Sequence, residues 1–205
     1  MGQQVRGRGQ QQHMILQEFY NLEESSGHGL QGSFTRDLTT SKLWLMQELA
    51  KIKPSVSTMY ILGSWFGNLA LYITLDPVIQ VDRMINVEIN PDMLNQSRRM
   101  LNKVGADNVQ YLLTNANQLD YNELDADSVV VNSSLNDIAG TNWFRNIPRG
   151  TTVVLQGRDQ VQQRQYRNTQ DIMSQFPLNR VLYQGTMKLE DPETPYQRCM
   201  VIGQK

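Results

Sequence analysis

The most constraining feature of this sequence is an apolar run that breaks at a glycine-containing turn and resumes as a helical pattern. Residues 59–62 are the apolar run, 63–67 are the turn, and the apolar positions of the helix begin at Leu69. A buried strand that leads through a tight turn into a helix has this pattern, because glycine adopts backbone angles that a β-carbon disfavours. The unpaired N–H groups at a helix start suit an anionic or strongly polar ligand group.

A second apolar run, residues 85–89, follows about twenty residues later and carries Glu88 near its end. In nucleotide-binding α/β folds an acid at the end of the second strand holds the ribose hydroxyls of the cofactor. The turn and the acid have the separation of a β-α-β unit, so together they predict a nucleoside-cofactor site. A dehydrogenase would need the pattern G-x-G-x-x-G, whereas Trp65 stands here in the place of the middle glycine.

The rest of the chain alternates between strand-like and helix-like segments. Such alternation is typical of a mostly parallel sheet with helices on both faces. A first helix is expected to start at Asp37 or Thr39 as N-cap and to stop before Pro54. The expected strands are 58–62, 84–89, 109–113, 128–132 and 151–156, the helices between them are 68–75, 91–104 and 143–146, and the polar stretch 159–176 is also expected to be helical.

The chain ends in two strand-like runs, 180–189 and 196–203, that are joined by a short turn. This connection is too short for a parallel crossover, so the two runs must form an antiparallel hairpin. The expected fold is therefore α/β: a Rossmann-like, seven-stranded, mostly parallel sheet with an antiparallel C-terminal hairpin and helices on both faces.

Residues 1–36 precede this domain, which we place at residues 37–205. The first residues are Gly, Gln and Arg without apolar periodicity, which predicts a mobile tail. A short amphipathic helix is expected next, and then a glycine-rich loop over residues 25–32. The loop is either a connector or a lid that folds over the site.

Composition excludes several classes of function. The net charge is −1, with 19 basic and 20 acidic residues, so duplex nucleic acid is not expected as a partner. The single cysteine, Cys199, cannot form an internal disulfide, and two histidines without a CxxC pattern predict no metal site. Neither a signal peptide nor a membrane-spanning run is recognisable, so we expect a cytoplasmic protein without a membrane partner.

The sequence resembles the class I S-adenosylmethionine-dependent methyltransferases over about residues 37–203. The resemblance rests on the glycine turn, the acid Glu88, polar residues after the third and fourth strands, and the final hairpin. In style it is similar to small methyltransferase-like proteins of bacteriophages, for which the host cytoplasm is the expected location. It implies S-adenosylmethionine as the cofactor, with Glu88 on the ribose hydroxyls, Ile89 on the adenine and Asn115 or Asn117 on its amino group. The residues implied to bind the cofactor are Gly63, Ser64, Trp65, Gly67, Glu88, Ile89, Asn115, Asn117 and Asn132.

The turn after the fourth strand, residues 132–137, is the candidate catalytic segment. The resemblance implies that Asn132 faces the reacting methyl group. Asp137 or His28 could accept a proton from an acceptor that must lose one. The alternative is that this segment is an Asx or Ser turn that caps the next helix.

Two residues depart from the family pattern inside the stretch that carries it. Ile61 stands where the family usually has an acid, and Trp65 replaces the middle glycine of the turn. The amino group of the cofactor would then be held by an acid elsewhere, such as Asp37.

The sequence thus predicts a S-adenosylmethionine-dependent methyltransferase whose acceptor is a small molecule, a protein or a nucleotide, and it leaves a homodimer open. Two alternatives stay open: a non-catalytic binding or structural protein with this fold, or another enzyme that uses the same cofactor for aminobutyrate or aminopropyl transfer or cleaves it. The final hairpin argues against a nicotinamide-dependent dehydrogenase. The one concentration of positive charge, which could meet an anionic acceptor, is formed by Arg158, Arg164, Arg167 and Arg180.

Overall fold

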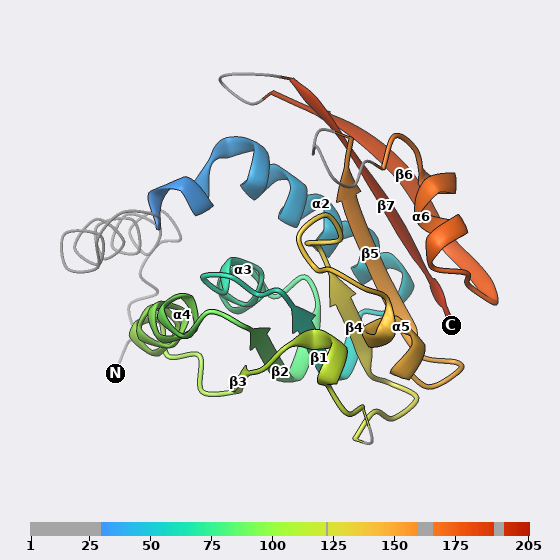
Figure 1. Ribbon diagram of the computed structural model, residues 1–205. Helices are drawn as coiled ribbons and strands as arrows, with labels where there is room; N and C mark the ends of the chain where they lie inside the picture. The colour runs from blue at the N-terminus through green and yellow to red at the C-terminus, as the bar shows by residue number, and fades with distance from the viewer. Residues whose placement is uncertain (1–29, 122, 160–165, 191–194) are drawn as a thin grey trace, which may run out of the picture.

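The computed structural model shows one seven-stranded sheet with helices on both faces (Figure 1). It describes residues 30–121, 123–159, 166–190 and 195–205. The strands lie in the order β3-β2-β1-β4-β5-β7-β6. Strands β1 to β5 pair with one another in parallel. The strands are β1 (Ser55–Leu62), β2 (Gln80–Glu88), β3 (Val109–Leu113), β4 (Val129–Asn132), β5 (Thr152–Arg158), β6 (Arg180–Leu189) and β7 (Tyr196–Gln204).

The last two strands form the antiparallel hairpin that the short connection requires. Strand β7 is antiparallel to β6 and also to β5, so it lies between them and β6 forms the edge of the sheet. The predicted Rossmann-like sheet with an antiparallel C-terminal hairpin is therefore confirmed.

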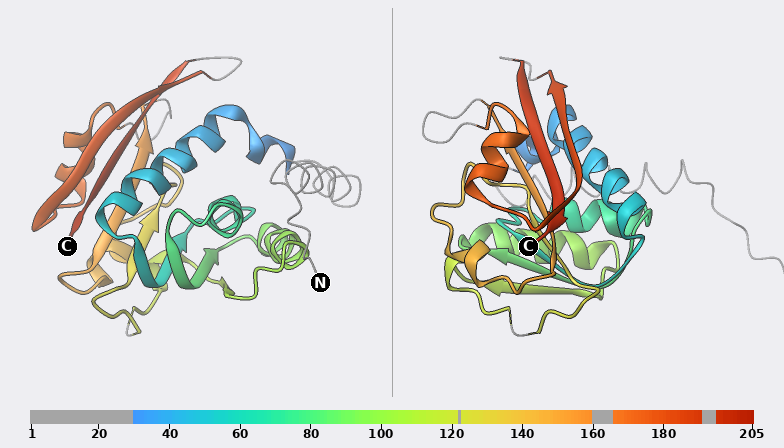
Figure 2. Two further views of the ribbon diagram at one scale, coloured as in Figure 1. Left: turned by 180° about the vertical axis from the view of Figure 1, so that it is seen from behind. Right: turned by 90° about the vertical axis from the view of Figure 1, so that its right-hand side faces the viewer.

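The helices form two layers, one on each face of the sheet (Figure 2). Helices α2 (Arg36–Ile52), α3 (Asn68–Leu75) and α4 (Pro91–Lys103) cover one face. Helices α5 (Asn142–Asn146) and α6 (Thr169–Gln175) cover the other, together with the short 3₁₀ helix η2 (Ala116–Gln118).

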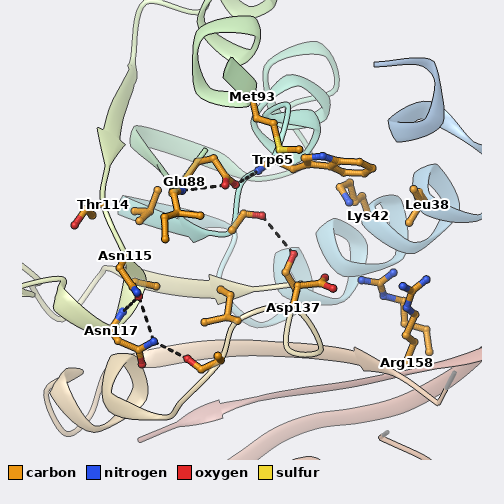
Figure 3. A pocket seen from close by; sticks show the side chains of 18 residues that line it. Leu38, Lys42, Trp65, Glu88, Met93, Thr114, Asn115, Asn117, Asp137 and Arg158 are labelled. Atoms are coloured by element: carbon orange, nitrogen blue, oxygen red, sulfur yellow. Dashed lines mark hydrogen bonds between the residues drawn. The ribbon is translucent and has the colours of Figure 1, made fainter. Parts of the chain in front are cut away.

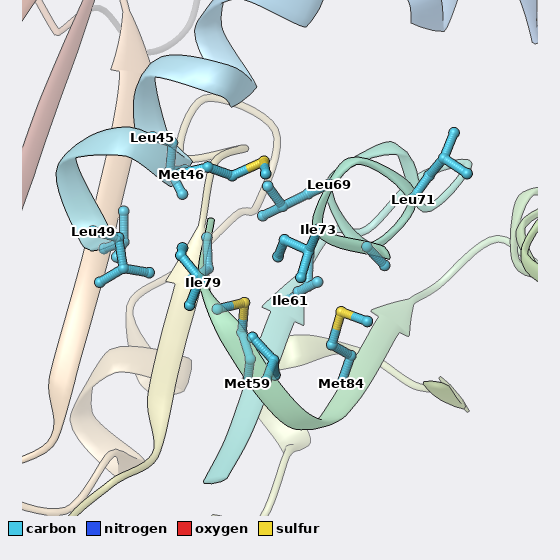
Figure 4. Close-up of a cluster of buried hydrophobic side chains, with 14 of the residues drawn as sticks. Leu45, Met46, Leu49, Met59, Ile61, Leu69, Leu71, Ile73, Ile79 and Met84 are labelled. Atoms are coloured by element: carbon cyan, nitrogen blue, oxygen red, sulfur yellow. The ribbon is translucent and has the colours of Figure 1, made fainter. Parts of the chain in front are cut away.

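The core follows from the two-residue period of the strands. In β1, Met59 and Ile61 point into the cluster under α2, α3 and α4, whereas Tyr60 and Leu62 point into the cluster under α5 and α6. Figure 4 shows the first cluster, where Leu45 and Leu49 of α2 approach the strand residues. A strand that is buried on both faces is apolar throughout, which is why residues 59–62 are a continuous apolar run.

Two of the expected helix boundaries are wrong. Helix α2 starts at Arg36 with Thr35 as the N-cap residue, so Asp37 lies in its first turn and Thr39 lies inside the helix. Within 159–176, only Thr169–Gln175 is an α-helix among the described residues. Asn168 has extended backbone angles, and its side chain accepts a hydrogen bond from the Asp171 N–H, so the helix begins there.

The order of the strands creates a switch point between β1 and β4. Leu62 at the end of β1 lies opposite Val87 of β2 on one side and Asn132 of β4 on the other. The chain runs outward from β1 to β3 and then returns to the other side of β1 to start β4. In open α/β sheets ligands bind beyond the carboxyl ends of the strands at such a point.

The predicted tail, the short helix, most of the glycine-rich loop with His28, and Arg164 lie outside the described residues. Within the described ranges, the 3₁₀ helix η1 (Gln31–Phe34) leads directly into α2. None of the helices described is long and apolar enough to cross a membrane.

Candidate functional site

A cavity of about 600 Å³ lies beyond the carboxyl ends of β1, β2, β3 and β4, at the switch point (Figure 3). Its volume lies within the roughly 300–1,000 Å³ range of small-molecule sites. Its wall combines residues of α2 and α4, of the segments that follow β1, β3 and β4, of the ends of β2 and β5, and of the start of β7. Among the lining residues are Lys42, Gly63, Glu88, Asn115, Asp137 and Arg158.

The turn after β1 has an unusual backbone. Gly63 and Gly67 have φ of 58° and 76°, and Trp65 between them has φ of 53°. Trp65 is the only non-glycine residue with positive φ in the described part of the chain, and this region is unfavourable for a side chain of that size. Trp65 lines the cavity, and its ring lies 5.0 Å from that of Phe66 between centroids.

Glu88 holds this turn in place. Its Oε2 accepts a hydrogen bond from the Trp65 N–H at 2.8 Å, and its Oε1 accepts from the N–H groups of Ile89 and Asn90 at 2.9 and 3.0 Å. The residue is only 8% exposed. The carboxylate therefore links the end of β2 to the glycine turn at the rim of the cavity.

The two glycines of the turn have different roles. Gly63 lines the cavity, and a Cβ there would lie 3.2 Å from Ser134 Cβ and 3.3 Å from Ile138 Cδ1. Gly67 does not line the cavity, and a Cβ there would lie 2.1 Å from Ser97 Oγ of α4. Gly67 thus allows α3 to start against α4, which is a packing role rather than a contact with the cavity.

Asn115 and Asn117 both line the cavity, and most of their polar atoms are used within the protein (Figure 3). Asn115 Oδ1 accepts from both the N–H and the Nδ2 of Asn117, at 2.9 and 3.2 Å. Asn117 also donates to the carbonyl of Ala139 and accepts from the N–H of Trp143. Among the described residues, the amide nitrogen of Asn115 has no acceptor, so it is available to a ligand.

Asn132 and Ser64 do not line the cavity. Asn132 is completely buried, and its Oδ1 accepts from the Ser134 N–H at 2.9 Å. This hydrogen bond fixes the turn after β4, as the Asx-turn alternative expects. Because Asn132 does not line the cavity, its side chain is not placed to face a reacting group there. Asp137, on the same turn, does line the cavity, and so does Ile89, which is 66% exposed.

Asp37 is also outside the cavity wall. Its carboxylate accepts a hydrogen bond from the Tyr196 hydroxyl at 2.6 Å. Burial alone would raise the pKa of Asp37, but this hydrogen bond and those from backbone N–H groups lower it below its ordinary value. Burial and the same carboxylate raise the pKa of Tyr196 to about 12. The pair joins α2 to β7, so Asp37 is not placed to hold the amino group of a cofactor.

Two cations of the cavity wall were not predicted from the sequence, Lys42 of α2 and Arg198 of β7. Burial and the neighbouring Arg198 lower the pKa of Lys42 to about 7. Arg198 is 7% exposed, and burial lowers its pKa from the ordinary value. The sequence signal for Arg198 was a charged residue directly before the apolar run 199–202 of the last strand.

The predicted cluster of four arginines is not one group in the structure. Arg158 lines the cavity, whereas Arg180 is exposed at the start of the edge strand β6 and Arg167 lies just before α6. Within the described residues, no group of three or more His, Cys, Asp or Glu side chains is arranged to hold a metal ion.

Comparison with known proteins agrees with this fold. The model of the ubiE/COQ5 methyltransferase family matches residues 38–178. No curated protein sequence matches this chain.

Solved structures share the fold at low sequence identity. The N-methyltransferase NodS from Bradyrhizobium japonicum, in complex with S-adenosyl-L-homocysteine, superposes with a TM-score of 0.58 at 10% identity, covering 90% of this chain and 97% of that one. An rRNA methylase from Streptococcus thermophilus gives a TM-score of 0.54 at 14% identity, covering 84% and 99%. The YcgJ protein from Bacillus subtilis gives 0.58 at 12% identity, covering 81% and 98%. Because the family model covers well over half of the sequence, the chain belongs to the ubiE/COQ5 methyltransferase family, and it is a S-adenosylmethionine-dependent methyltransferase.

Proposed function

We propose that the cavity binds S-adenosylmethionine with its nucleoside beside β2 and β3, and that the methyl group passes to a small-molecule acceptor bound between α2 and the turn after β4. The observation that carries this proposal is the hydrogen bond between Trp65 N–H and Glu88, which joins the glycine turn to the acid of β2 at the cavity rim. The cofactor supplies an electrophilic methyl group. The residues of the chain supply its binding, its orientation and a proton acceptor.

Glu88 has room to accept a hydrogen bond from one ribose hydroxyl. A carboxylate offers about four lone-pair sites, and three are occupied here by backbone N–H groups. One site of Oε2 stays open to a hydroxyl donor. The exposed side chain of Ile89, next in the chain, provides the apolar surface on which adenine would pack.

The adenine contact is better assigned to Asn115 than to Asn117. Both lone pairs of Asn115 Oδ1 are used by Asn117, so this oxygen has no capacity left for an adenine amino group. The amide nitrogen of Asn115 would instead donate to a ring nitrogen of adenine. Asn117 would keep η2 and the turn after β4 in register through Ala139.

Positioning supplies much of the rate of a methyl transfer, because the reaction is an in-line displacement. Asp137 is the carboxylate that the turn after β4 presents to the cavity. We assign to it the role of general base for an acceptor that must lose a proton. Asn132 is assigned a positioning role, since it fixes the turn that carries Ser134 and Asp137.

Calorimetric titration of the full chain with S-adenosylmethionine tests the proposal. The wild type should bind, and Glu88→Ala should weaken binding by about 1.5–3 kcal/mol, the scale of hydrogen bonds to a charged group. Glu48→Ala is the matched control, because Glu48 lies on α2 in an ion pair with Lys51 and does not line the cavity. Equal affinity of the wild type and Glu88→Ala would contradict the assignment of Glu88.

Mass spectrometry of the cofactor product separates the remaining alternatives. Methyl transfer yields S-adenosylhomocysteine, whereas aminobutyrate or aminopropyl transfer yields methylthioadenosine. Absence of any cofactor binding at millimolar concentration would favour a non-catalytic protein. That alternative is suggested by Ile61, a buried apolar residue in the place where the family usually has an acid.

A further inference from the structure

The cavity has a cationic end. Lys42 of α2, Arg158 at the end of β5 and Arg198 of β7 all line it. Figure 3 shows Lys42 and Arg158 on the side of the cavity opposite Asn115 and Asn117, with Asp137 between the two sides. Three elements that are distant in the sequence therefore bring positive charge to one place.

These cations are not balanced by carboxylates of the described residues. None of the three forms an ion pair among those found in the described ranges, and Asp137 is the carboxylate that lines this part of the cavity. Asp37, which also acts on Lys42, is engaged with Tyr196. The described part of the chain thus leaves an excess of positive charge at this end.

Arg198 has an unsatisfied hydrogen-bond donor. Its residue is only 7% exposed, and one Nη donates to the carbonyl of Ser133. Its Nε is buried and has no hydrogen-bond partner among the described residues. Burying a charged donor without an acceptor is costly, and an anion in the cavity would offset part of this cost.

We propose that Lys42, Arg158 and Arg198 bind a carboxylate or phosphate group of the methyl acceptor, which is therefore an anionic small molecule. This inference rests on the proposed function, because it assigns the opposite end of the cavity to the nucleoside of the methyl donor. A planar guanidinium binds either anion through two parallel hydrogen bonds, and Lys42 adds a point charge.

The charge of the methyl donor favours the acceptor as the source of the anion. S-adenosylmethionine carries one carboxylate, one ammonium and one sulfonium, so it brings a net positive charge. An anionic acceptor balances both the sulfonium and the cationic end. In the transfer, a lone pair of the acceptor forms the new bond to the methyl carbon, and the electrons of the broken bond remain on sulfur. A proton lost by the acceptor goes to Asp137.

Calorimetry on the full chain saturated with S-adenosylhomocysteine tests this inference. The probes are inorganic phosphate, benzoate and benzamide, the last being the neutral counterpart of benzoate, all at constant ionic strength. We expect saturable binding of phosphate or benzoate and none of benzamide. Arg158→Met and Lys42→Met should each weaken anion binding by about tenfold or more. Arg180→Met is the matched control, because Arg180 is exposed outside the cavity. Thermal unfolding of each variant confirms that it is folded.

The outcomes separate this inference from the proposed function. If the wild type binds S-adenosylhomocysteine but neither anion, or binds benzamide as well as benzoate, the inference is wrong and the proposed function stands. If Arg158→Met weakens binding of S-adenosylhomocysteine but not of methylthioadenosine, the cations hold the carboxylate of the donor and the inference is wrong. If the wild type binds no cofactor, the proposed function fails and the inference falls with it.

Discussion

The backbone N–H of Trp65 donates to Glu88 Oε2 at 2.8 Å, and this hydrogen bond joins the turn after β1 to the acid at the end of β2. Trp65 has φ of 53°, a conformation that costs a residue with a β-carbon roughly 1–2 kcal/mol. The hydrogen bond to a buried carboxylate offsets this cost and directs the indole into the cavity wall. The residue that departs from the glycine pattern is therefore held by the acid of the same site.

Comparing Trp65→Gly with Trp65→Ala measures the backbone strain. Both variants lose the indole, but only glycine adopts φ of 53° freely. We expect Trp65→Gly to be more stable than Trp65→Ala by about 0.5–1 kcal/mol, because the relief of strain exceeds the entropy that glycine gains in the unfolded chain. Urea unfolding provides the measurement. A less stable glycine variant would show that the turn is not strained.

Gly67→Ala should destabilise the fold by about 1–3 kcal/mol in urea unfolding, because the new Cβ would lie 2.1 Å from Ser97 Oγ and φ is 76°. Ser97→Gly in the same chain removes the obstructing atoms and should recover part of the loss. Gly105→Ala is a control for the effect of φ alone, since Gly105 has φ of 73° and open space around it. Equal losses at Gly67 and Gly105 would contradict a packing role for Gly67.

Lys42→Met should change how stability depends on pH. The folded pKa of Lys42 is about 7 against an ordinary value of 10.5. Below pH 7 both states hold the proton and the folded state bears the cost of burying the charge. Between pH 7 and 10.5 only the unfolded state holds it, so the stability that Lys42 contributes rises with pH. The advantage of Lys42→Met over the wild type should shrink by about 1–2 kcal/mol from pH 6 to pH 9.5.

Urea unfolding in a phosphate-free buffer measures this difference, since phosphate is a proposed ligand of the same side chain. Lys53→Met is the control, because Lys53 is in an ion pair with the exposed Asp127 and does not line the cavity. Parallel pH profiles of the wild type and Lys42→Met would show that burial does not lower the pKa of Lys42.

Tyr196→Phe should destabilise the fold by about 1–2 kcal/mol at neutral pH, because it removes the hydroxyl that donates to the buried Asp37. The folded pKa of Asp37 is lowered, so its contribution to stability is present above the ordinary value of 3.8 and is lost as the pH falls below it. The effect of Tyr196→Phe should therefore diminish in acid. Tyr111→Phe is the control, because the Tyr111 hydroxyl has no hydrogen-bond partner in the described part of the chain. The two variants should differ clearly in unfolding experiments at pH 7, and this difference should shrink as the pH is lowered below 3.8.

Most of the fold could be predicted because the signals that define it are local. The two-residue and helical periods predicted the strands and helices, and the length of the last connection required an antiparallel hairpin. The glycine turn and Glu88 were found for the same reason, since their spacing is a property of one β-α-β unit. The errors are at the start of α2, where Thr35 occupies the N-cap position without a side-chain capping hydrogen bond, and over residues 159–176, where capping by Asn168 competes with weak periodicity.

The sequence by itself determined the strands, the final hairpin and several residues of the cavity wall, among them Gly63, Glu88 and Asn115, because each of these follows from neighbours along the chain. Only the tertiary structure decided the order of the strands and the cationic end of the cavity. Insertion of β7 between β5 and β6 buries Arg198 beside the turn after β4, and the packing of α2 on the sheet brings Lys42 to it. A lysine on a helix or an arginine in a final strand has no local pattern that tells a cavity wall from a solvated surface, because only the long-range packing determines which face is covered.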